Sequence, residues 1–469
     1  MKKLVNVRLP LIIACFLIAG VCAGLLFFTN KISLLWIIAV IPVTAIIFIF
    51  TLIFSSCRRL GITIILCGLF LIAGTVNCFL RLDAYSTKKL TDNQTYTICA
   101  TVYEKGETAY GEYVIVNNAR TGGVKIDGKI CVYLGETYGS FCEAGYKVEF
   151  TARIRNNTAF EYGKLNTNAE NNIKYTCSIN GGLEAKRGFS FFGSIRSAVR
   201  STLYDNLDGE AAAVAYAMLT GNTQGIGDGT IATFRYGGIA HIFAVSGLHI
   251  GIVYGILYFI LKRLRINRFL KAVLCLTPVL LYAGICGFTV SSMRAFIMCA
   301  VSATAKAAYK KYDGLNALSL SVIILLAVSP LNAFSVGFQL SVCAVAAIQV
   351  LKLPRKLPKA LRIPLAAQAG TLPVLIANFG YLSGAGLLLN IIIVPMISVF
   401  FSVMFISTAV CTAVPAVSAV LPYTALPLQA VLSFLSGAGF EKSLVSGFGA
   451  GLFIPFTISG FYRFPIRLI

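Results

Sequence analysis

The two histidines of the chain, His241 and His249, fall in one short apolar stretch, and Ser246 lies three residues before the second of them. Residues three apart share one face of a helix, so Ser246 and His249 could form a serine nucleophile with its base. Such a hydrolase also needs an orienting carboxylate, and the nearest one in sequence, Asp228, is not obviously placed to serve. The alternative is that both histidines cap or bridge helices by hydrogen bonding. We therefore predict no catalytic residue here.

Three glycines follow the serine at four-residue spacing: Gly247, Gly251 and Gly255. In membrane helices, a stripe of small residues at this spacing lets a second helix approach closely. We therefore expect a tight helix contact along the stripe, with the serine and the two histidines holding neighbouring helices by hydrogen bonds.

Arg294 stands within another apolar run, shortly after Ser291 and Ser292. Burying an arginine in a membrane costs free energy unless the side chain is paired or hydrated, so such an arginine is a functional candidate. We predict that Arg294 faces an aqueous path and contacts phosphate, with the two serines as polar lining. The alternative is a side chain near a helix end that extends to the membrane surface.

A few more polar residues could line such a path or form hydrogen bonds between helices: Arg235, Gln339, Ser341 and Asn390. Two histidines cannot make a histidine-rich metal cluster, and the chain has no Gly-x-x-x-x-Gly-Lys-[Ser/Thr] run for a nucleotide. We therefore expect no metal, no cofactor and no built-in motor.

These residues lie in apolar segments, and the composition of the chain is that of a membrane protein. The chain has 469 residues, of which 57% are hydrophobic and 12% charged, unlike a soluble globular domain. Because a span takes about 20 apolar residues, the apolar runs predict an α-helical polytopic membrane protein with about 11–12 transmembrane helices. The first run follows Met1-Lys2-Lys3 without a clean cleavage site, so it is interpreted as a retained span. The runs lie at about 9–28, 32–54, 60–80, 239–261, 271–287, 290–306, 314–330, 334–351, 363–381, 384–406, 407–425 and 443–459.

The pattern changes between the third and fourth runs. Short alternating stretches such as 96–103 and 113–116 are separated by glycine-containing turn signals, which is typical of a small all-β domain. Its size suits a five-stranded barrel of the oligonucleotide-binding (OB) type, with a plain β-sandwich as the alternative. We predict three transmembrane helices in 1–82, the β domain in 83–190, interfacial or re-entrant helices in 191–233, and a membrane domain in 234–469.

The charge is unevenly distributed. The net charge is +22, yet residues 83–187 hold 12 acidic and 13 basic residues, and only Asp313 and Glu441 are acidic from Ile231 onward. Basic loops on one side of the membrane and contact with anionic lipids explain most of this excess, and a path for a polyanion is the functional alternative. The same basic loops predict a cytoplasmic N-terminus and place 83–190 outside the cell.

Four of the 14 cysteines lie in the predicted outer domain: Cys99, Cys131, Cys142 and Cys177. A disulfide among them is plausible outside the cell, and the sequence leaves three full pairings open. None of them shows a CxxC spacing, which argues against zinc.

Four ordered motifs resemble the ComEC competence family. The first is the run His241-Ile-Phe-Ala-Val-Ser246-Gly247-Leu-His249. The others are Tyr282 to Ala295 with its Gly287 and Arg294, the stretch from Asp313 to Ser341, and Gln368 through Phe379-Gly380 to Pro395. A β domain after two or three spans is also the family arrangement, so the resemblance covers nearly the whole chain.

The resemblance implies a channel for single-stranded DNA in the plasma membrane of a bacterium, used in natural transformation. It implies a surface DNA receptor and a cytoplasmic helicase-like ATPase as partners beside membrane lipids, and it leaves room for a homo-oligomer. Many members carry a metallo-β-lactamase-like domain with a His-x-His-x-Asp-His cluster, which we expect this chain to lack. The competing functions are a secondary transporter of a small solute and, less favoured, the Ser246–His249 hydrolase.

Overall fold

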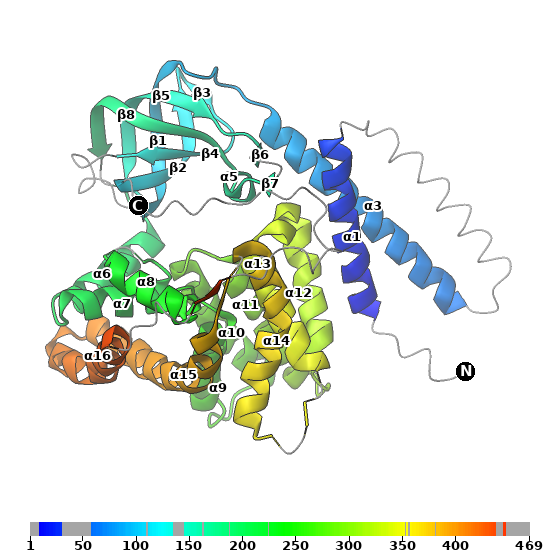
Figure 1. Cartoon of the computed structure of the whole chain (residues 1–469), viewed down its shortest axis with the longest axis vertical. Coiled ribbons are helices and arrows are strands. Elements are labelled where there is room, and N and C mark those ends of the chain that lie inside the picture. Colours follow the sequence, from blue (N-terminus) through cyan, green and yellow to red (C-terminus); the bar gives the residue numbers. More distant parts are fainter. Residues whose placement is uncertain are drawn as a thin grey trace.

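A small β-barrel lies above a bundle of helices in the computed structural model, and two long helices run along one flank (Figure 1). The structure describes residues 9–30, 58–108, 111–134, 145–161, 164–186, 188–223, 225–351, 353–354, 357–379, 381–437 and 444–446. The apolar run predicted at 32–54 lies outside the described residues, as does most of the run at 443–459.

The flanking helices are α1 (Leu9–Thr29) and α3 (Arg58–Ser86). They pack in parallel with almost no space between them, because glycines stand at the contact. A methyl group added at Gly24 would lie 2.6 Å from the carbonyl oxygen of Thr75, and one at Gly74 would lie 2.6 Å from that of Leu17. The small-residue packing that we predicted for the stripe after Ser246 therefore occurs here, where Gly20 and Gly24 are also four residues apart.

The β domain is a closed barrel of five main strands: β1 (Thr95–Thr108), β2 (Gly111–Thr121), β4 (Lys129–Tyr133), β5 (Lys147–Asn156) and β8 (Ile173–Lys186). Counted one to five, they pair around the ring in the order 1-2-3-5-4-1, with only the third and fifth parallel. This closed ring fits the OB-type barrel and excludes the open sandwich. The short elements β3 (Val124–Lys125), β6 (Phe160–Glu161), β7 (Lys164–Leu165) and α5 (Thr167–Glu170) complete the domain.

Alternation along the strands builds the barrel core. Successive residues of β5 are alternately exposed and buried, so Phe150 and Ile154 point inward. They meet Ile98, Val116 and Tyr175 from other strands in one hydrophobic cluster. The period-two pattern of the sequence is thus the direct cause of this core.

The cysteines of the barrel form no disulfide among the described residues. Cys99 is exposed on β1, while Cys131 and Cys177 are buried free thiols, and Cys142 lies outside the described residues. Cys131 pairs with Thr176, so Cys131 and Cys177 point to opposite faces of the β4–β8 pair. A bond between these two thiols would require a change of strand register. The disulfide predicted among the four cysteines stays a prediction, because Cys142 lies outside the described residues.

The barrel is fixed to the helices by buried contacts. The Tyr85 hydroxyl at the end of α3 donates to the carbonyl oxygen of Ile173 at 2.8 Å. Ala159 and Ala169 of the barrel domain share a hydrophobic cluster with Tyr85 and with Leu331 of the bundle.

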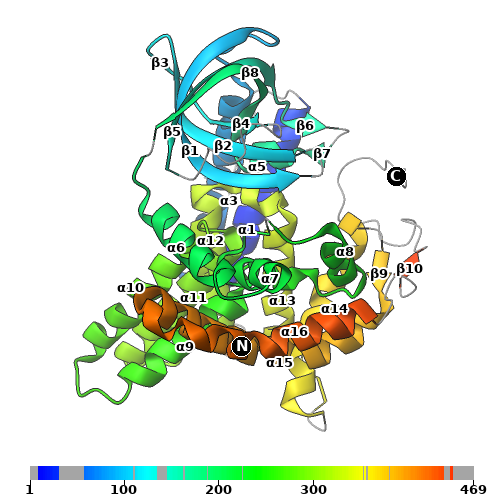
Figure 2. The same ribbon diagram turned by 90° about the vertical axis from the view of Figure 1, so that its left-hand side faces the viewer.

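The bundle contains both long and short helices, with α15 and α16 running across it beside α7 (Figure 2). Its elements are α6 (Phe191–Tyr204), α7 (Gly209–Thr220), α8 (Asp228–Tyr236), η2 (Ala240–Ile242), α9 (Gly247–Leu261), α10 (Arg268–Ile285), α11 (Val290–Ala307), α12 (Gly314–Val328), η3 (Pro330–Phe334), α13 (Val336–Val350), α14 (Lys359–Phe379), β9 (Tyr381–Ser383), α15 (Gly384–Ala413), η4 (Pro415–Val420), α16 (Leu421–Gly437) and β10 (Leu444–Ser446).

Several helices have the length and apolarity that a membrane requires. Among the described residues, five are long and apolar enough to cross a bilayer: Leu9–Thr29, Ile65–Ser86, Arg268–Ile285, Ile393–Ala413 and Pro415–Ser433. Three shorter helices, α9, α12 and α13, are also apolar. The expected count of about 11–12 is higher than this number of described spans. The boundary that we predicted between 406 and 407 lies inside α15, and the next span begins at Pro415 instead.

Helix α7 lies in the segment 191–233, which we predicted to hold interfacial or re-entrant helices. Every residue from Ala211 to Thr220 is buried, so this helix lies inside the bundle rather than on a surface. The Tyr282 hydroxyl of α10 donates to the carbonyl oxygen of Leu219 at 3.0 Å and satisfies one carbonyl at the end of α7.

Candidate functional site

Helix α9 begins inside the bundle, at the serine of the His241–His249 run. Ser246 is the N-cap: its Oγ accepts from the Leu248 amide at 3.2 Å, and its own amide donates to Nδ1 of His249 at 3.3 Å. Serine and histidine thus form a capping box rather than sharing a helix face, and no hydrogen bond joins Ser246 Oγ to the imidazole among the described residues. The His249 ring is buried and stacks on Phe401 of α15 at 4.3 Å between centroids. This geometry supports the capping interpretation of the pair.

Helix α9 is short for a membrane span. Its 15 residues measure about 22 Å at about 1.5 Å per residue, whereas a bilayer's hydrocarbon core is about 30 Å thick. The end of α9 leads into the basic loop of Lys262 to Arg268, on the side away from the barrel. The positive end of the helix dipole therefore points toward the barrel side of the bundle.

Arg294 of α11 lies directly against this helix start. A methyl group added at Gly247 would come within 2.9 Å of the Arg294 Nη2 atom and 3.4 Å of the Ala295 Cβ atom. A methyl group at Gly251 or Gly255 would meet no atom within 4 Å. The predicted close helix contact along the stripe is therefore wrong beyond Gly247, because the space beside the other two glycines is open.

The guanidinium of Arg294 is buried and poorly satisfied. The residue is only 5% exposed, which excludes the alternative of a side chain that extends to the surface. Its Nη1 atom approaches the Met298 sulfur at 3.9 Å, and its Nε atom has no hydrogen-bond partner in the described chain. No described carboxylate forms an ion pair with it. Removing a charge from water costs several kcal/mol in a protein unless a partner compensates, so this position is expensive for a purely structural residue.

The serines near Arg294 hold helices together. Ser291 Oγ and Ser341 Oγ are 3.2 Å apart and join α11 to α13. Ser292 is buried and donates to the carbonyl oxygen of Thr289, the N-cap of α11, at 2.8 Å. Gln339 donates to the carbonyl oxygen of Ala333 at 3.1 Å. In this conformation these polar groups have structural partners.

The remaining candidates are spread over the bundle. Arg235 is exposed in the last turn of α8. His241 lies in η2 and interacts electrostatically with His249. The Oδ1 atom of Asn390 in α15 is buried without a hydrogen-bond partner in the described chain. The structure thus brings His249, Gly247 and Arg294 to one place and leaves Arg235 and Asn390 without a contact to them.

Sequence reasoning missed a second arginine with few partners, the half-buried Arg196 in α6. Its Nε atom is buried and has no partner among the described residues. It interacts electrostatically with Tyr103 of the barrel and with Cys286 at the end of α10. Arg196 therefore lies between the barrel and the turn that begins α11. The sequence gives no sign of this contact, because an arginine in an amphipathic helix is normally read as a solvent-exposed residue.

The barrel presents aromatic and basic side chains on neighbouring strands. The Tyr113 and Tyr133 rings of β2 and β4 are 6.2 Å apart between centroids. The Lys129 ammonium of β4 lies 4.0 Å from the centre of the Tyr103 ring of β1. In OB-type barrels the second and third strands, here β2 and β4, are the oligonucleotide-binding face.

Carboxylates are scarce in the bundle. From Ile231 onward only Asp313 and Glu441 are acidic, and Asp313 accepts from the Leu315 and Asn316 amides at the start of α12. Among the described residues, no group of three His, Cys, Asp or Glu side chains could hold a metal ion.

Comparison with known proteins gives one family and two relatives. The family model described as competence protein matches residues 218–462. ComE operon protein 3 of Bacillus subtilis (strain 168) is 29% identical over 208 residues, which are 43% of this chain and 27% of that protein. A protein of Aquifex aeolicus (strain VF5), named only as uncharacterized, is 32% identical over 168 residues, 35% of this chain and 39% of its own length. The matched segment is therefore well under half of either relative. No solved structure matches the chain.

Proposed function

The chain belongs to the competence protein family, and from this premise we propose that it forms a channel for single-stranded DNA in the plasma membrane of a bacterium. The observation that carries the proposal is the Arg294 guanidinium against the start of α9. Both groups are positive, the guanidinium is buried, and no described carboxylate pairs with the arginine. A helix N-terminus with an arginine beside it is a natural site for a phosphate group.

A route from the barrel to this site is part of the proposal. A single strand would first stack bases on the exposed rings of Tyr103 and Tyr133, since every base offers a face for stacking. Its phosphates would then pass Arg196 and reach Arg294. Ion-coupled carriers usually place carboxylates near the membrane midplane, and their scarcity in this bundle argues against the small-solute alternative.

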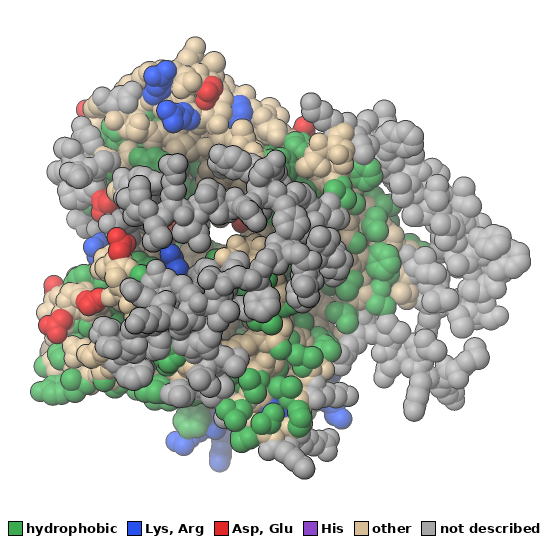
Figure 3. Space-filling model, viewed as in Figure 1, with side chains coloured by type: hydrophobic (Ala, Val, Ile, Leu, Met, Phe, Trp, Pro, Cys, Tyr) green, Lys and Arg blue, Asp and Glu red, His purple; other side chains and the backbone are tan. Residues whose placement is uncertain are grey.

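The several apolar helices and the family fit a multi-pass membrane protein. We further propose that the barrel lies outside the cell. In support, Lys and Arg side chains gather at the end of the bundle opposite the barrel (Figure 3), as expected for a cytoplasmic face. A surface DNA receptor and a cytoplasmic ATPase would deliver and pull the strand, because DNA must be moved by an external motor.

Uptake in a deletion strain tests the function. In cells lacking this chain, we expect radiolabelled DNA to bind at the surface as before, while internalised single strands and transformants fall to background. A plasmid copy should restore both, and accumulation of small solutes should not change. Normal transformation in the deletion strain would refute the channel.

Thiol labelling tests the topology. A membrane-impermeant maleimide should label Cys99 in intact cells, because this thiol is exposed on β1. Cys131 should react far more slowly, since burial raises the pKa of its thiol to about 11 and little thiolate exists at neutral pH. Lys310→Cys, in an exposed loop at the opposite end, should label only in inverted vesicles. The reverse pattern for Cys99 and Lys310→Cys would place the barrel in the cytoplasm.

A further inference from the structure

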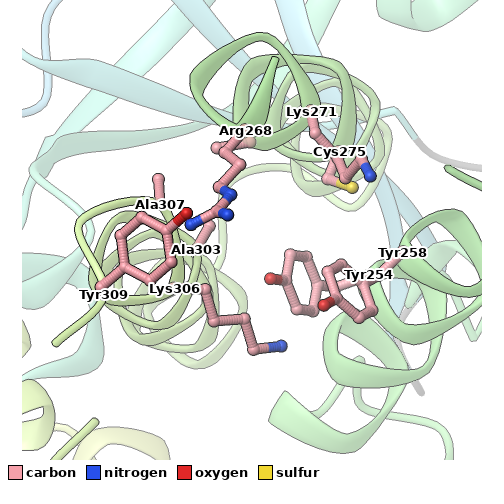
Figure 4. A pocket seen from close by; sticks show the side chains of 10 residues that line it. Tyr254, Tyr258, Arg268, Lys271, Cys275, Ala303, Lys306, Ala307 and Tyr309 are labelled. Carbon is pink, nitrogen blue, oxygen red and sulfur yellow. The ribbon is translucent and has the colours of Figure 1, made fainter. Parts of the chain in front are cut away.

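The bundle contains a cavity of about 240 Å³ between α9, α10 and α11, at the end away from the barrel. Small residues, Ala303 and Ala307 of α11, are buried at the cavity and leave it room. Tyr254 and Tyr258 of α9 face it from one side (Figure 4). The cavity is separate from the Arg294 site, which lies three turns of α11 nearer the barrel.

Three cations line the cavity: Arg268, Lys271 and Lys306. Arg268 lies over the Tyr309 ring at 3.5 Å, and Lys306 lies over the Tyr258 ring at 4.0 Å (Figure 4). Lys271 donates to the carbonyl oxygen of Leu264 at 3.1 Å. No carboxylate belongs to the lining, so three positive charges meet here without a compensating negative group.

The faces of α9 and α10 that turn away from the cavity are apolar. The first turns of α10, which supply Arg268 and Lys271, also expose Phe269, Leu270 and Val273, each at least half exposed. Phe259 and Ile260 of α9 are exposed to a similar degree. Apolar outer faces on the helices that carry a cationic hollow match the boundary of a bilayer, where acyl chains lie beside phosphate groups.

We propose that this cavity binds the phosphate of an anionic phospholipid of the cytoplasmic leaflet, with the acyl chains lying on the exposed side chains of α9 and α10. Arg268 and Lys306 contact the phosphate, and the tyrosine hydroxyls are placed to donate to the headgroup. The inference rests on the proposed function only for the orientation in the membrane. The apolar outer faces of α9 and α10 favour lipid over nucleic acid, because a DNA strand would leave these side chains uncovered.

Native mass spectrometry of the purified full chain in detergent can test the site, with phosphatidylglycerol as the probe and phosphatidylcholine for comparison. For Arg268→Gln/Lys306→Gln we expect the apparent Kd for phosphatidylglycerol to rise at least tenfold, with phosphatidylcholine binding unchanged. Lys310→Gln/Lys311→Gln is the matched control, since it removes two neighbouring exposed charges that do not line the cavity. Its Kd should change less than twofold.

Each other result would overturn the proposal. Equal weakening in both double variants would mean non-specific attraction to surface charge. Displacement of the lipid by millimolar glycerol phosphate, at the affinity of the lipid itself, would identify a site for free phosphates. Displacement by a thymidine oligonucleotide in wild type but not in Arg268→Gln/Lys306→Gln would assign the cavity to DNA. Since this assay measures no uptake, its failure is distinct from failure of the channel.

Discussion

Replacing Arg294 by alanine is expected to reduce DNA uptake about 30-fold while the protein remains in the membrane at its normal level. A hydrogen bond to a charged group contributes about 2 kcal/mol, which corresponds to this factor. The protein should not be destabilised, because the substitution removes a buried charge that no described carboxylate pairs with. We therefore expect Arg294→Ala to reduce DNA uptake without reducing the stability of the protein.

Two further variants sharpen the test. Arg294→Met keeps an unbranched side chain beside Met298 and should lose uptake like alanine, which removes cavity formation as an explanation. Arg294→Lys should be intermediate, because the charge remains but the planar fork is lost. Arg265→Ala, in the exposed loop before α10, is the control for lost charge and should take up DNA normally.

The measurements are uptake of labelled strands and the amount of protein in the membrane fraction. Normal uptake in Arg294→Met would show that the guanidinium has no contact with DNA. Loss of the protein from the membrane in all three variants would mean that the arginine is structural, and would remove the main support for the phosphate path.

The barrel and most helices follow from local patterns, and for that reason they could be predicted. Alternation in β5 buries Phe150 and Ile154, and apolar length defines helices such as α10 and α11. Arg294 could also be singled out, since it is the charge within an otherwise apolar run. Strand alternation, apolar length and a charge within an apolar run each depend on residues that are close in the chain, so they can be seen in the sequence.

What could not be predicted depends on contacts between distant segments. Hydropathy treats 239–261 as one run, whereas the chain breaks at Ser246, where the N3 residue of the capping box is a histidine rather than the usual glutamate or glutamine. Glycine spacing cannot tell which stripe meets a helix, so Gly24 was missed and Gly251 was overvalued. The position of Arg196 beside Tyr103 likewise depends on how the barrel sits on the bundle.

Gly247→Ala is expected to reduce DNA uptake about fivefold to tenfold, whereas Gly251→Ala should leave uptake unchanged. The loss is smaller than for Arg294→Ala, because the guanidinium is displaced from the proposed phosphate site rather than removed. Both substitutions replace glycine by alanine in α9, and alanine has the higher helix propensity, so neither is expected to destabilise the helix. They differ in what the new methyl group meets. At Gly247 it would lie 2.9 Å from the Arg294 Nη2 atom, and at Gly251 it would meet no atom within 4 Å.

The end of an arginine side chain is flexible, so the alanine at Gly247 is accommodated by moving the guanidinium away from the start of α9. The two positive groups that we propose to share one phosphate then no longer point to the same place, while folding is preserved. Thermal unfolding of the purified variants should therefore show no loss of stability for either alanine. The contact at Gly247 therefore predicts that the two alanine variants differ in DNA uptake but not in thermal stability.

A double substitution gives the decisive comparison. If Gly247→Ala acts through the guanidinium, it should have no further effect once Arg294 is alanine, so the two losses should not add. Fully additive losses would mean that Gly247 acts elsewhere, for example on the amide groups at the start of α9. Loss of uptake in Gly251→Ala, in a stable protein, would instead restore the glycine stripe as a helix contact and contradict the open space that the structure places beside it.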